Sequence, residues 1–286
     1  MKRSVVAGID SSGESLVAAE WAARQAASLG LELRLVHAAL PLAGDPAYEP
    51  VAFSWQRTGE ELLQRAKTCL TSRYPRVAVH GAQVADTAAN ALLAASETSE
   101  LLVVGARGDG GFDGLVVGST ALAVAGTASC AVAVVPPPRA AAAHEAEVAV
   151  GVSVRQPADP PLEFAFGAAR LRGARLRAVH AWELPGHASW TAAAVPEEDR
   201  AAWEDHEVQQ LSDVLRSRQD RYPAVPVFPD VVLLHPAYAL MHSSHRADLL
   251  VLGRHSSPRP AERRLGPVAH AVLHHSRCPV VIVPHT

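Results

Sequence analysis

Short apolar runs separated by turn residues recur along the chain. In the first half these runs are VVAGI, LRLVHA, VAVHGA, LLVVG and AVAVVP, and each has the length and the aliphatic content of a buried strand. Longer segments with helical character lie between them, such as ESLVAAEWAARQAASLG, ADTAANALLAASETS and STALAVAGTAS. The first of these helices has Ser11 or Ser12 as a candidate N-cap and Gly30 near its end. Alternation of such strands with helices predicts a doubly wound, mostly parallel α/β sheet.

The same pattern occurs twice. ELRLVHA at 32–38 matches RLRAVHA at 175–181, and ELLVVGAR at 100–107 matches DLLVLGRH at 248–255. The offset grows from 143 to 148 residues between these two matches, so the second copy contains five extra residues. We therefore predict a tandem duplication in which each copy forms a five-stranded sheet flanked by helices.

The repeat also predicts the domain boundaries. PPPRAAAAHEAE separates the two copies and is typical of a spacer. We predict a first domain at 1–138, a linker at 139–147 and a second domain at 148–286. The difference in length falls between about residues 39 and 72, where we expect a variable surface loop.

One loop of the first copy is rich in glycine. GARGDGGFDGLVVGST, at 105–120, follows the LLVVG run and ends where a helix is expected to begin. In open parallel sheets, ligands bind beyond the carboxyl ends of strands, and the amides at a helix N-terminus attract anions. We expect Gly105 and Gly108 to adopt positive φ angles near a polyphosphate, and Gly118 with Ser119 to present helix-start amides and a hydroxyl. A simple surface turn is the alternative interpretation.

The glycine spacing belongs to a wider pattern. Gly-x-x-Gly, nine residues and Gly-Ser, with VVAGIDSS at the start, VHA after the second strand run and CAVAVVP at the end of the copy, resemble the universal stress protein family. The resemblance covers both copies. It implies an α/β fold of the adenine nucleotide alpha hydrolase type and ATP as the ligand of the first copy, and it leaves open whether Mg²⁺ accompanies the nucleotide.

The resemblance also implies individual contacts. It assigns Asp10, with Ser11 beside it, to the sugar or adenine side of the nucleotide, and the backbone around Ala38 to adenine. It assigns the phosphates to the glycine loop and the helix start, namely to Gly105, Gly108, Gly118, Ser119 and Thr120.

Some of these residues have simpler interpretations. Asp10 could serve only as a helix cap, and Arg107, a secondary candidate for a phosphate contact, could be a solvated loop residue. Asp109 and Asp113 could approach a magnesium ion, but acidic residues beside glycine commonly serve turns, so no metal site is predicted.

The second copy departs from the pattern. The same spacing gives Gly253, Ser256 and Gly266 followed by Pro267, while Ser153 stands where the first copy has Asp10. Pro267 removes a helix-start amide and a hydroxyl but can still open a helix. We therefore expect poor or no ATP binding in the second copy. Its basic loop could hold another anion or be a solvated cluster, and it contains Arg254, Arg259, Arg263 and Arg264.

Charge, apolar content, cysteines and histidines argue against several classes of protein. A net charge of −3 gives no broad basic field for nucleic acid, and no apolar run is long enough to span a membrane or resembles a signal peptide. Three separated cysteines fit a reducing cytoplasm, and Cys130 and Cys278 are expected to be buried packing residues. We interpret the histidines as surface residues and not a zinc site, including His242, His245, His270, His274 and His275.

No motif nominates catalytic residues. The leading hypothesis is an ATP-binding regulator in stress adaptation with an unknown protein partner. The alternatives are an enzyme that cleaves or transfers part of a nucleotide, weak ATPase activity included, and a nucleotide-free interaction scaffold. The final apolar strands of the copies are expected to pair within one chain as a pseudo-dimer, and dimerisation of whole molecules is left open.

Overall fold

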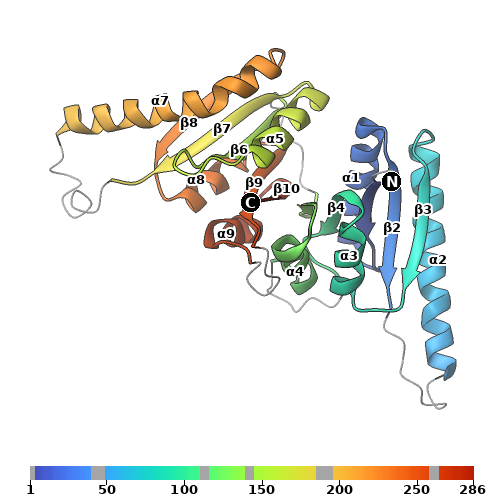
Figure 1. Cartoon of the computed structure of the whole chain (residues 1–286). Helices are drawn as coiled ribbons and strands as arrows, with labels where there is room; N and C mark the ends of the chain where they lie inside the picture. Colours follow the sequence, from blue (N-terminus) through green and yellow to red (C-terminus); the bar gives the residue numbers. More distant parts are fainter. Residues whose placement is uncertain (1–3, 40–48, 110–115, 139–144, 185–195, 258–263) are drawn as a thin grey trace. The chain divides into compact units, whose positions relative to one another are not determined.

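The computed structural model describes residues 4–39, 49–109, 116–138, 145–184, 196–257 and 264–286 (Figure 1). Internal contacts divide the chain into two compact units. Unit 1 comprises Met1–Arg139 with Ser256–Leu265, and unit 2 comprises Ala140–His255 with Gly266–Thr286. The predicted linker at 139–147 lies largely outside the described residues, so the predicted domain boundaries stay a prediction.

The sheet of unit 1 has five strands in the order β3-β2-β1-β4-β5, and all of its described strand pairs are parallel. Its central strands are almost wholly apolar and buried, because helices cover both faces. The strands are β1 (Ser4–Gly8), β2 (Glu32–Ala38), β3 (Val79–Val84), β4 (Ser99–Gly105) and β5 (Ala131–Val135).

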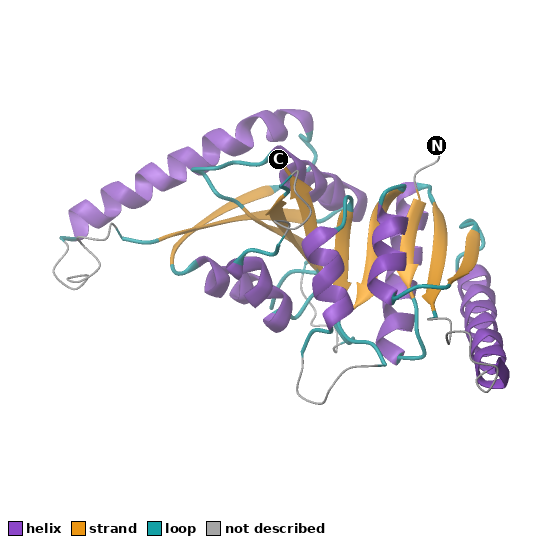
Figure 2. Cartoon of the chain, turned by 60° about the horizontal axis from the view of Figure 1, so that its bottom comes forward, coloured by secondary structure: helices purple, strands orange, loops and turns teal. Residues whose placement is uncertain are grey.

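Four helices flank this sheet (Figures 1 and 2). Two of them, α1 and α2, contact one face, while α3 and α4 contact each other and the opposite face. Their bounds are α1 (Gly13–Leu29), α2 (Glu49–Arg73), α3 (Ala88–Ser96) and α4 (Ser119–Thr127).

Helix α1 begins and ends where its sequence predicts. Ser12 is the N-cap, and its Oγ accepts a hydrogen bond from the backbone N–H of Ser15 at 3.1 Å. Gly30 closes the helix with a φ of 66°, which a residue with a Cβ adopts only with strain. These two caps place the segment from Asp10 to Ser12 directly at the carboxyl end of β1.

Unit 2 repeats this architecture, with parallel strands in the order β10-β9-β6-β7-β8. Its strands are β6 (Glu147–Gly151), β7 (Arg175–Trp182), β8 (Val227–Leu233), β9 (Leu249–His255) and β10 (Val280–His285). Helix α5 packs against β6, β7, β9 and β10, and α7 packs against β8. Helix α8 packs against β7 and α9. Their bounds are α5 (Asp159–Arg172), α7 (Glu197–Arg221), α8 (Pro236–Ser243) and α9 (Pro267–His275).

A buried ion-pair network lies in unit 2. The Glu147 side chain is fully buried and accepts hydrogen bonds from Arg175 Nε at 2.7 Å and from Arg177 Nε at 2.8 Å. Burial acts to raise the pKa of Glu147, but the guanidinium groups of Arg177 and then Arg175 outweigh it and hold the pKa below its usual range. The corresponding position in the first copy is Ser4, so this network is not part of the common fold.

The α/β fold class, with two tandem five-stranded parallel sheets, is confirmed by these elements.

The prediction of a surface loop between residues 39 and 72 is wrong for most of that segment, because Glu49–Arg73 forms α2. Leu63, Ala66 and Leu70 are buried at helical spacing on this segment. Its counterpart α7 matches it at an offset of 148, so the five extra residues fall before the helix, in a region that includes residues outside the described ranges. No helix in the described part of the chain is long and apolar enough to cross a membrane.

Candidate functional site

A cavity of about 420 Å³ opens at the carboxyl end of the sheet of unit 1. It lies where β1, β2 and β4 end and where α3 and α4 begin, and its volume falls within the range of about 300–1,000 Å³ that is typical of small-molecule sites. Its lining combines apolar side chains, such as Val36, Leu92 and Val104, with residues of the glycine loop and of the start of α4. Such a lining suits a ligand with a flat apolar part and an anionic part.

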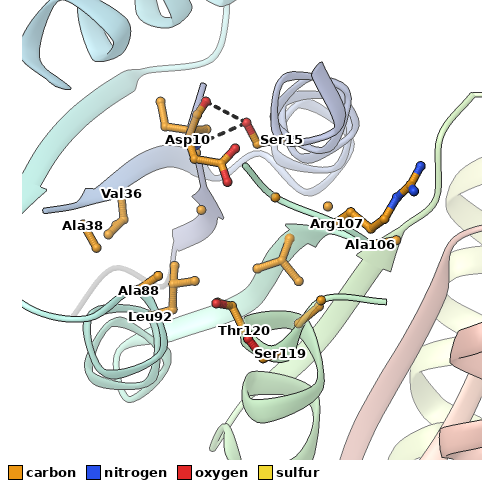
Figure 3. Close-up of a pocket in the computed structure, with 17 residues that line it drawn as sticks. Asp10, Ser15, Val36, Ala38, Ala88, Leu92, Ala106, Arg107, Ser119 and Thr120 are labelled. Atoms are coloured by element: carbon orange, nitrogen blue, oxygen red, sulfur yellow. Dashed lines mark hydrogen bonds between the residues drawn. The ribbon is translucent and has the colours of Figure 1, made fainter. Parts of the chain in front are cut away.

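The structure brings together eight of the nine candidate residues at this cavity (Figure 3). They come from three segments that are far apart in the sequence, and they are Asp10, Ala38, Gly105, Arg107, Gly108, Gly118, Ser119 and Thr120. The ninth, Ser11, is not a lining residue, and its hydroxyl donates to the Asp109 carboxylate.

Asp10 is engaged by its own chain on both carboxylate oxygens. Oδ1 accepts from the Ser12 backbone N–H at 3.0 Å and from the Ser12 hydroxyl at 2.5 Å, and Oδ2 accepts from the Asp109 N–H at 3.1 Å. Burial acts to raise the pKa of Asp10, but these hydrogen bonds outweigh it and hold the pKa below its usual value. Asp10 is therefore a carboxylate at neutral pH. It is not the N-cap of α1, since Ser12 has that role.

The start of the glycine loop is held against the turn between β1 and α1. The Asp10–Asp109 hydrogen bond and the Ser11–Asp109 contact are joined by an ion pair between Arg107 and Glu14, whose atoms lie 3.5 Å apart. In Figure 3 the Arg107 side chain extends away from the other labelled residues. Burial and the nearby Asp10 carboxylate raise the pKa of Asp109. Asp113, the other acidic residue considered above, lies outside the described residues.

The loop glycines are needed for close approach and not for an unusual backbone angle. Among the described glycines, only Gly30 and Gly173 have positive φ, so the positive φ expected at Gly105 and Gly108 is wrong. A Cβ built on Gly108 would lie 2.4 Å from Asp10 Oδ2, and one built on Gly105 would lie 3.0 Å from the backbone of Glu14. A side chain at Gly105 would press against the Glu14 backbone, and one at Gly108 would have to displace the Asp10 carboxylate.

The N-terminus of α4 faces the cavity without a side-chain cap. Gly118 is the N-cap residue, and its own N–H donates to the Ala106 C=O at 2.7 Å, which fixes the approach of the chain. No acidic side chain stands in the first turn of α4, so the N–H groups at Ser119 and Thr120 remain available to an external anion. The two hydroxyls add further donors at the same edge.

Sequence reasoning missed the wall formed by Ala88 and Leu92 at the start of α3. Their segment was expected to be a helix, but nothing in its sequence distinguishes a lining residue from a packing residue. Ser15 was also missed, although its hydroxyl donates to the Asp10 C=O at 2.9 Å and accepts from the Asp10 N–H at 3.2 Å.

Comparison with known proteins identifies the family of the chain. A model of the universal stress protein family matches residues 1–136 and 147–284. The chain belongs to the universal stress protein family. Universal stress protein Rv1996 of Mycobacterium tuberculosis is 31% identical over 301 residues, which cover 97% of this chain and 94% of the relative. Universal stress protein Rv2623 of the same organism is 30% identical over 287 residues, with 97% and 95% coverage.

The fold is also that of a solved family member. A universal stress protein from Archaeoglobus fulgidus superposes with a TM-score of 0.72 at 15% identity, covering 99% of this chain and 98% of that chain. This likeness concerns the fold alone. Together with the family match, it confirms that the chain contains two universal stress protein domains in tandem.

In the second universal stress protein domain the corresponding residues are used differently. The Ser153 hydroxyl accepts from the Gln156 N–H at 3.2 Å, and Pro267 opens α9, as expected. A Cβ built on Gly253 would lie 3.0 Å from the His285 ring and from Pro161. The interpretation of Arg254 as solvated is wrong, because its side chain is buried, whereas Arg264 is exposed and Arg259 and Arg263 lie outside the described residues.

In the described part of the chain, no group of three or more histidine, cysteine, aspartate or glutamate side chains is arranged to hold a metal ion. Cys278 is buried, as expected, and burial raises its pKa to about 12. The expectation that Cys130 is also buried is wrong, because Cys130 is only half-buried.

Proposed function

We propose that the first domain binds ATP and that the protein acts as a nucleotide-dependent regulator in the cytoplasm during stress adaptation. The observation that carries this proposal is a cavity of the described part of unit 1 that is lined together by residues from β1, β2, the glycine loop and α4. Its apolar wall suits a purine base, and the uncapped start of α4, with Ser119 and Thr120, suits phosphate. The family match supports the same assignment, since many universal stress proteins bind ATP.

The charges near the loop favour ATP with Mg²⁺ over bare ATP. Asp10, Glu14 and Asp109 supply three carboxylates, while Arg107 supplies one guanidinium that Glu14 already pairs. A polyphosphate alone would be repelled by this excess of negative charge, whereas a divalent cation held by the phosphates would offset it. We therefore expect tighter binding in the presence of Mg²⁺.

We propose that the first domain binds ATP without hydrolysing it efficiently. Both carboxylate oxygens of Asp10 already accept hydrogen bonds from Ser12 and Asp109, so Asp10 is not placed as a general base. The alternative of a nucleotide-cleaving or nucleotidyl-transferring enzyme predicts sustained, Asp10-dependent product formation. Incubation of the full chain with MgATP followed by product analysis separates the two, since intact ATP rejects the enzyme.

The direct test is to denature the purified full chain and to identify and quantify any released nucleotide by mass. Calorimetric titration of the nucleotide-free protein with MgATP then gives the stoichiometry, which we expect to be one per chain. Gly118→Glu places a carboxylate at the phosphate end and should abolish binding. Gly266→Glu, the matched change in the second domain, should leave binding unchanged. Binding that survives Gly118→Glu would refute the assignment to the first domain.

We further propose that β5 and β10 pair within one chain. Within its own unit each of these strands stands at one end of the strand order; β5 is wholly aliphatic, and β10 is aliphatic from Val280 to Val283. An uncovered apolar edge is an aggregation hazard that pairing removes. Small-angle scattering should therefore give a single compact particle, and two independently moving lobes would contradict the pairing. The same profile, with sedimentation, shows whether whole molecules dimerise.

The regulatory role requires that ATP changes the protein beyond its cavity. Hydrogen exchange of the full chain with and without MgATP should show altered protection in segments that do not line the cavity. Protection confined to lining residues would favour the nucleotide-carrying scaffold, and no nucleotide at all would favour the nucleotide-free scaffold.

A further inference from the structure

The hydrogen-bond ladder between β1 and β2 stops at the edge of the cavity. The last register pair joins Gly8 to Val36, and the Ile9 N–H donates to the Val36 C=O at 2.9 Å. A regular parallel ladder would continue with the Ala38 N–H donating to the Ile9 C=O. That bond is absent from the hydrogen bonds of these described residues. The Ile9 C=O lies instead 3.0 Å from Nδ1 of His37.

The imidazole thus takes the place of a backbone amide. Because a carbonyl oxygen only accepts, Nδ1 of His37 must carry the proton and donate it. Side chains alternate along a strand, so His37 points to the opposite face from Val36 and Ala38, which both line the cavity. A Cβ built on Gly59 of α2 would lie 2.6 Å from His37 Cδ2, so this glycine leaves the ring the space it occupies.

The backbone N–H and C=O of Ala38 are left without a partner on the described strand β1. The Ala39 N–H donates to the Val84 C=O at 3.0 Å on the β3 side, so the polar groups of Ala38 face the β1 side, where β1 has already ended. Ala38 therefore presents an N–H next to a C=O at the wall of the cavity. This pair complements a base edge that has a ring nitrogen acceptor beside an exocyclic amine.

We infer that His37 is a positioning residue for base recognition: by donating to Ile9 C=O, it prevents the ladder from closing on Ala38 and keeps the Ala38 N–H available to an amine-bearing purine. This inference rests on the proposed function, since it assigns the base to the β2 side of the same cavity. It adds a role for His37, which does not line the cavity, in the selection of one base over another.

The second domain offers a matched control. His180 Nδ1 lies 3.1 Å from the Val152 C=O, and Val152 N–H donates to Val179 C=O at 2.9 Å, so the same interruption occurs there. His180 Nε2 additionally lies 3.0 Å from Glu207, which stands where the first domain has Gly59. His180→Ala changes the same contact in a domain where Ser153, Ser256 and Pro267 replace Asp10, Gly108 and Ser119.

The first measurement needs no ligand. In the nucleotide-free full chain, the Ala38 amide should exchange rapidly with solvent deuterium, and His37→Ala should slow it by at least about tenfold, because the amide then joins Ile9 C=O. His37→Asn, whose side-chain amide can donate near the position of Nδ1, should keep the exchange fast. Equal Ala38 exchange in wild type and His37→Ala would overturn the inference.

The second measurement compares ATP with inosine triphosphate, which carries a carbonyl and a protonated ring nitrogen at the same edge. The wild type should prefer ATP by at least about tenfold. His37→Ala should reduce this preference to within about threefold, whereas His37→Asn and His180→Ala should retain it. Equal weakening of both nucleotides, with the preference intact, would reduce His37 to a structural role and refute the inference. Wild-type protein that binds no nucleotide would refute the proposed function, while the exchange measurement would still decide whether His37 controls Ala38.

Discussion

The carboxylate of Asp10 occupies the space beside Gly108, so that a Cβ at Gly108 would lie 2.4 Å from Asp10 Oδ2. The two residues come from different ends of the first domain and meet where β1 and β4 end side by side. The same oxygen accepts a hydrogen bond from the Asp109 N–H. A side chain at position 108 would displace this oxygen and so disturb the hydrogen bond. This relationship explains why the loop requires a glycine although its backbone angles do not.

Gly108→Ala should therefore weaken ATP binding. The added methyl group displaces the Asp10 carboxylate, and the loss of its charge-assisted bond to Asp109 should lower affinity by about tenfold or more. Calorimetric titration with MgATP measures this change. Gly13→Ala is the control, because a Cβ built on Gly13 meets nothing within 4 Å. Unchanged affinity in Gly108→Ala, or an equal loss in Gly13→Ala, would contradict the explanation.

Asp10 should titrate at lower pH than an ordinary aspartate. Its pKa in the folded state lies below the unfolded value of about 3.9, so its carboxylate contributes stability that is present above that value and is lost as pH falls through the folded pKa. A carbon-detected NMR titration of the side-chain carboxyl should give a midpoint below 3.9. Ser12→Ala removes one donor to Oδ1 and should raise that midpoint. A midpoint at or above 3.9 in the wild type would show that burial dominates.

Glu147→Gln should destabilise the second domain. Arg175 and Arg177 would lose the buried carboxylate that they share, and breaking such a pair costs roughly 3–5 kcal/mol. We expect the lower end of this range because Arg175 keeps its ion pair with Glu145 and Arg177 keeps its ion pair with Asp230. Denaturant unfolding followed by a probe in the second domain measures the loss. Glu145→Gln is the matched control, since Glu145 also pairs with Arg175 but its side chain is 82% exposed. Its removal should cost no more than about 1 kcal/mol. Equal costs would argue against the importance of burial.

Arg107→Ala should have a small effect. The Arg107 side chain is partly exposed, pairs with Glu14 and extends away from the cavity (Figure 3). We expect less than about 1 kcal/mol in stability and less than about fivefold in MgATP affinity. Titrations at low and high salt test the second number. A loss of tenfold or more that disappears at high salt would show that Arg107 turns towards the phosphates when ATP binds.

Much of the fold follows from local patterns. Aliphatic runs such as LLVVG form buried parallel strands, and the caps at Ser12 and Gly30 define α1, because propensity and capping depend on neighbouring residues. The helix α2 escaped prediction although Leu63, Ala66 and Leu70 have helical spacing. Prolines and glycines precede this helix and are typical of a loop, whereas its apolar stripe is identified by its burial against the sheet.

The duplication, the α/β alternation, the glycine spacing and its loss in the second copy can all be read from the order of residues along the chain. How these residues act became clear only from the folded structure. It showed that Gly108 accommodates Asp10, that Ser11 turns to Asp109, and that Ala88 and Leu92 complete the cavity wall. These contacts join segments up to 99 residues apart. They depend on strand register and helix packing, which no local pattern specifies.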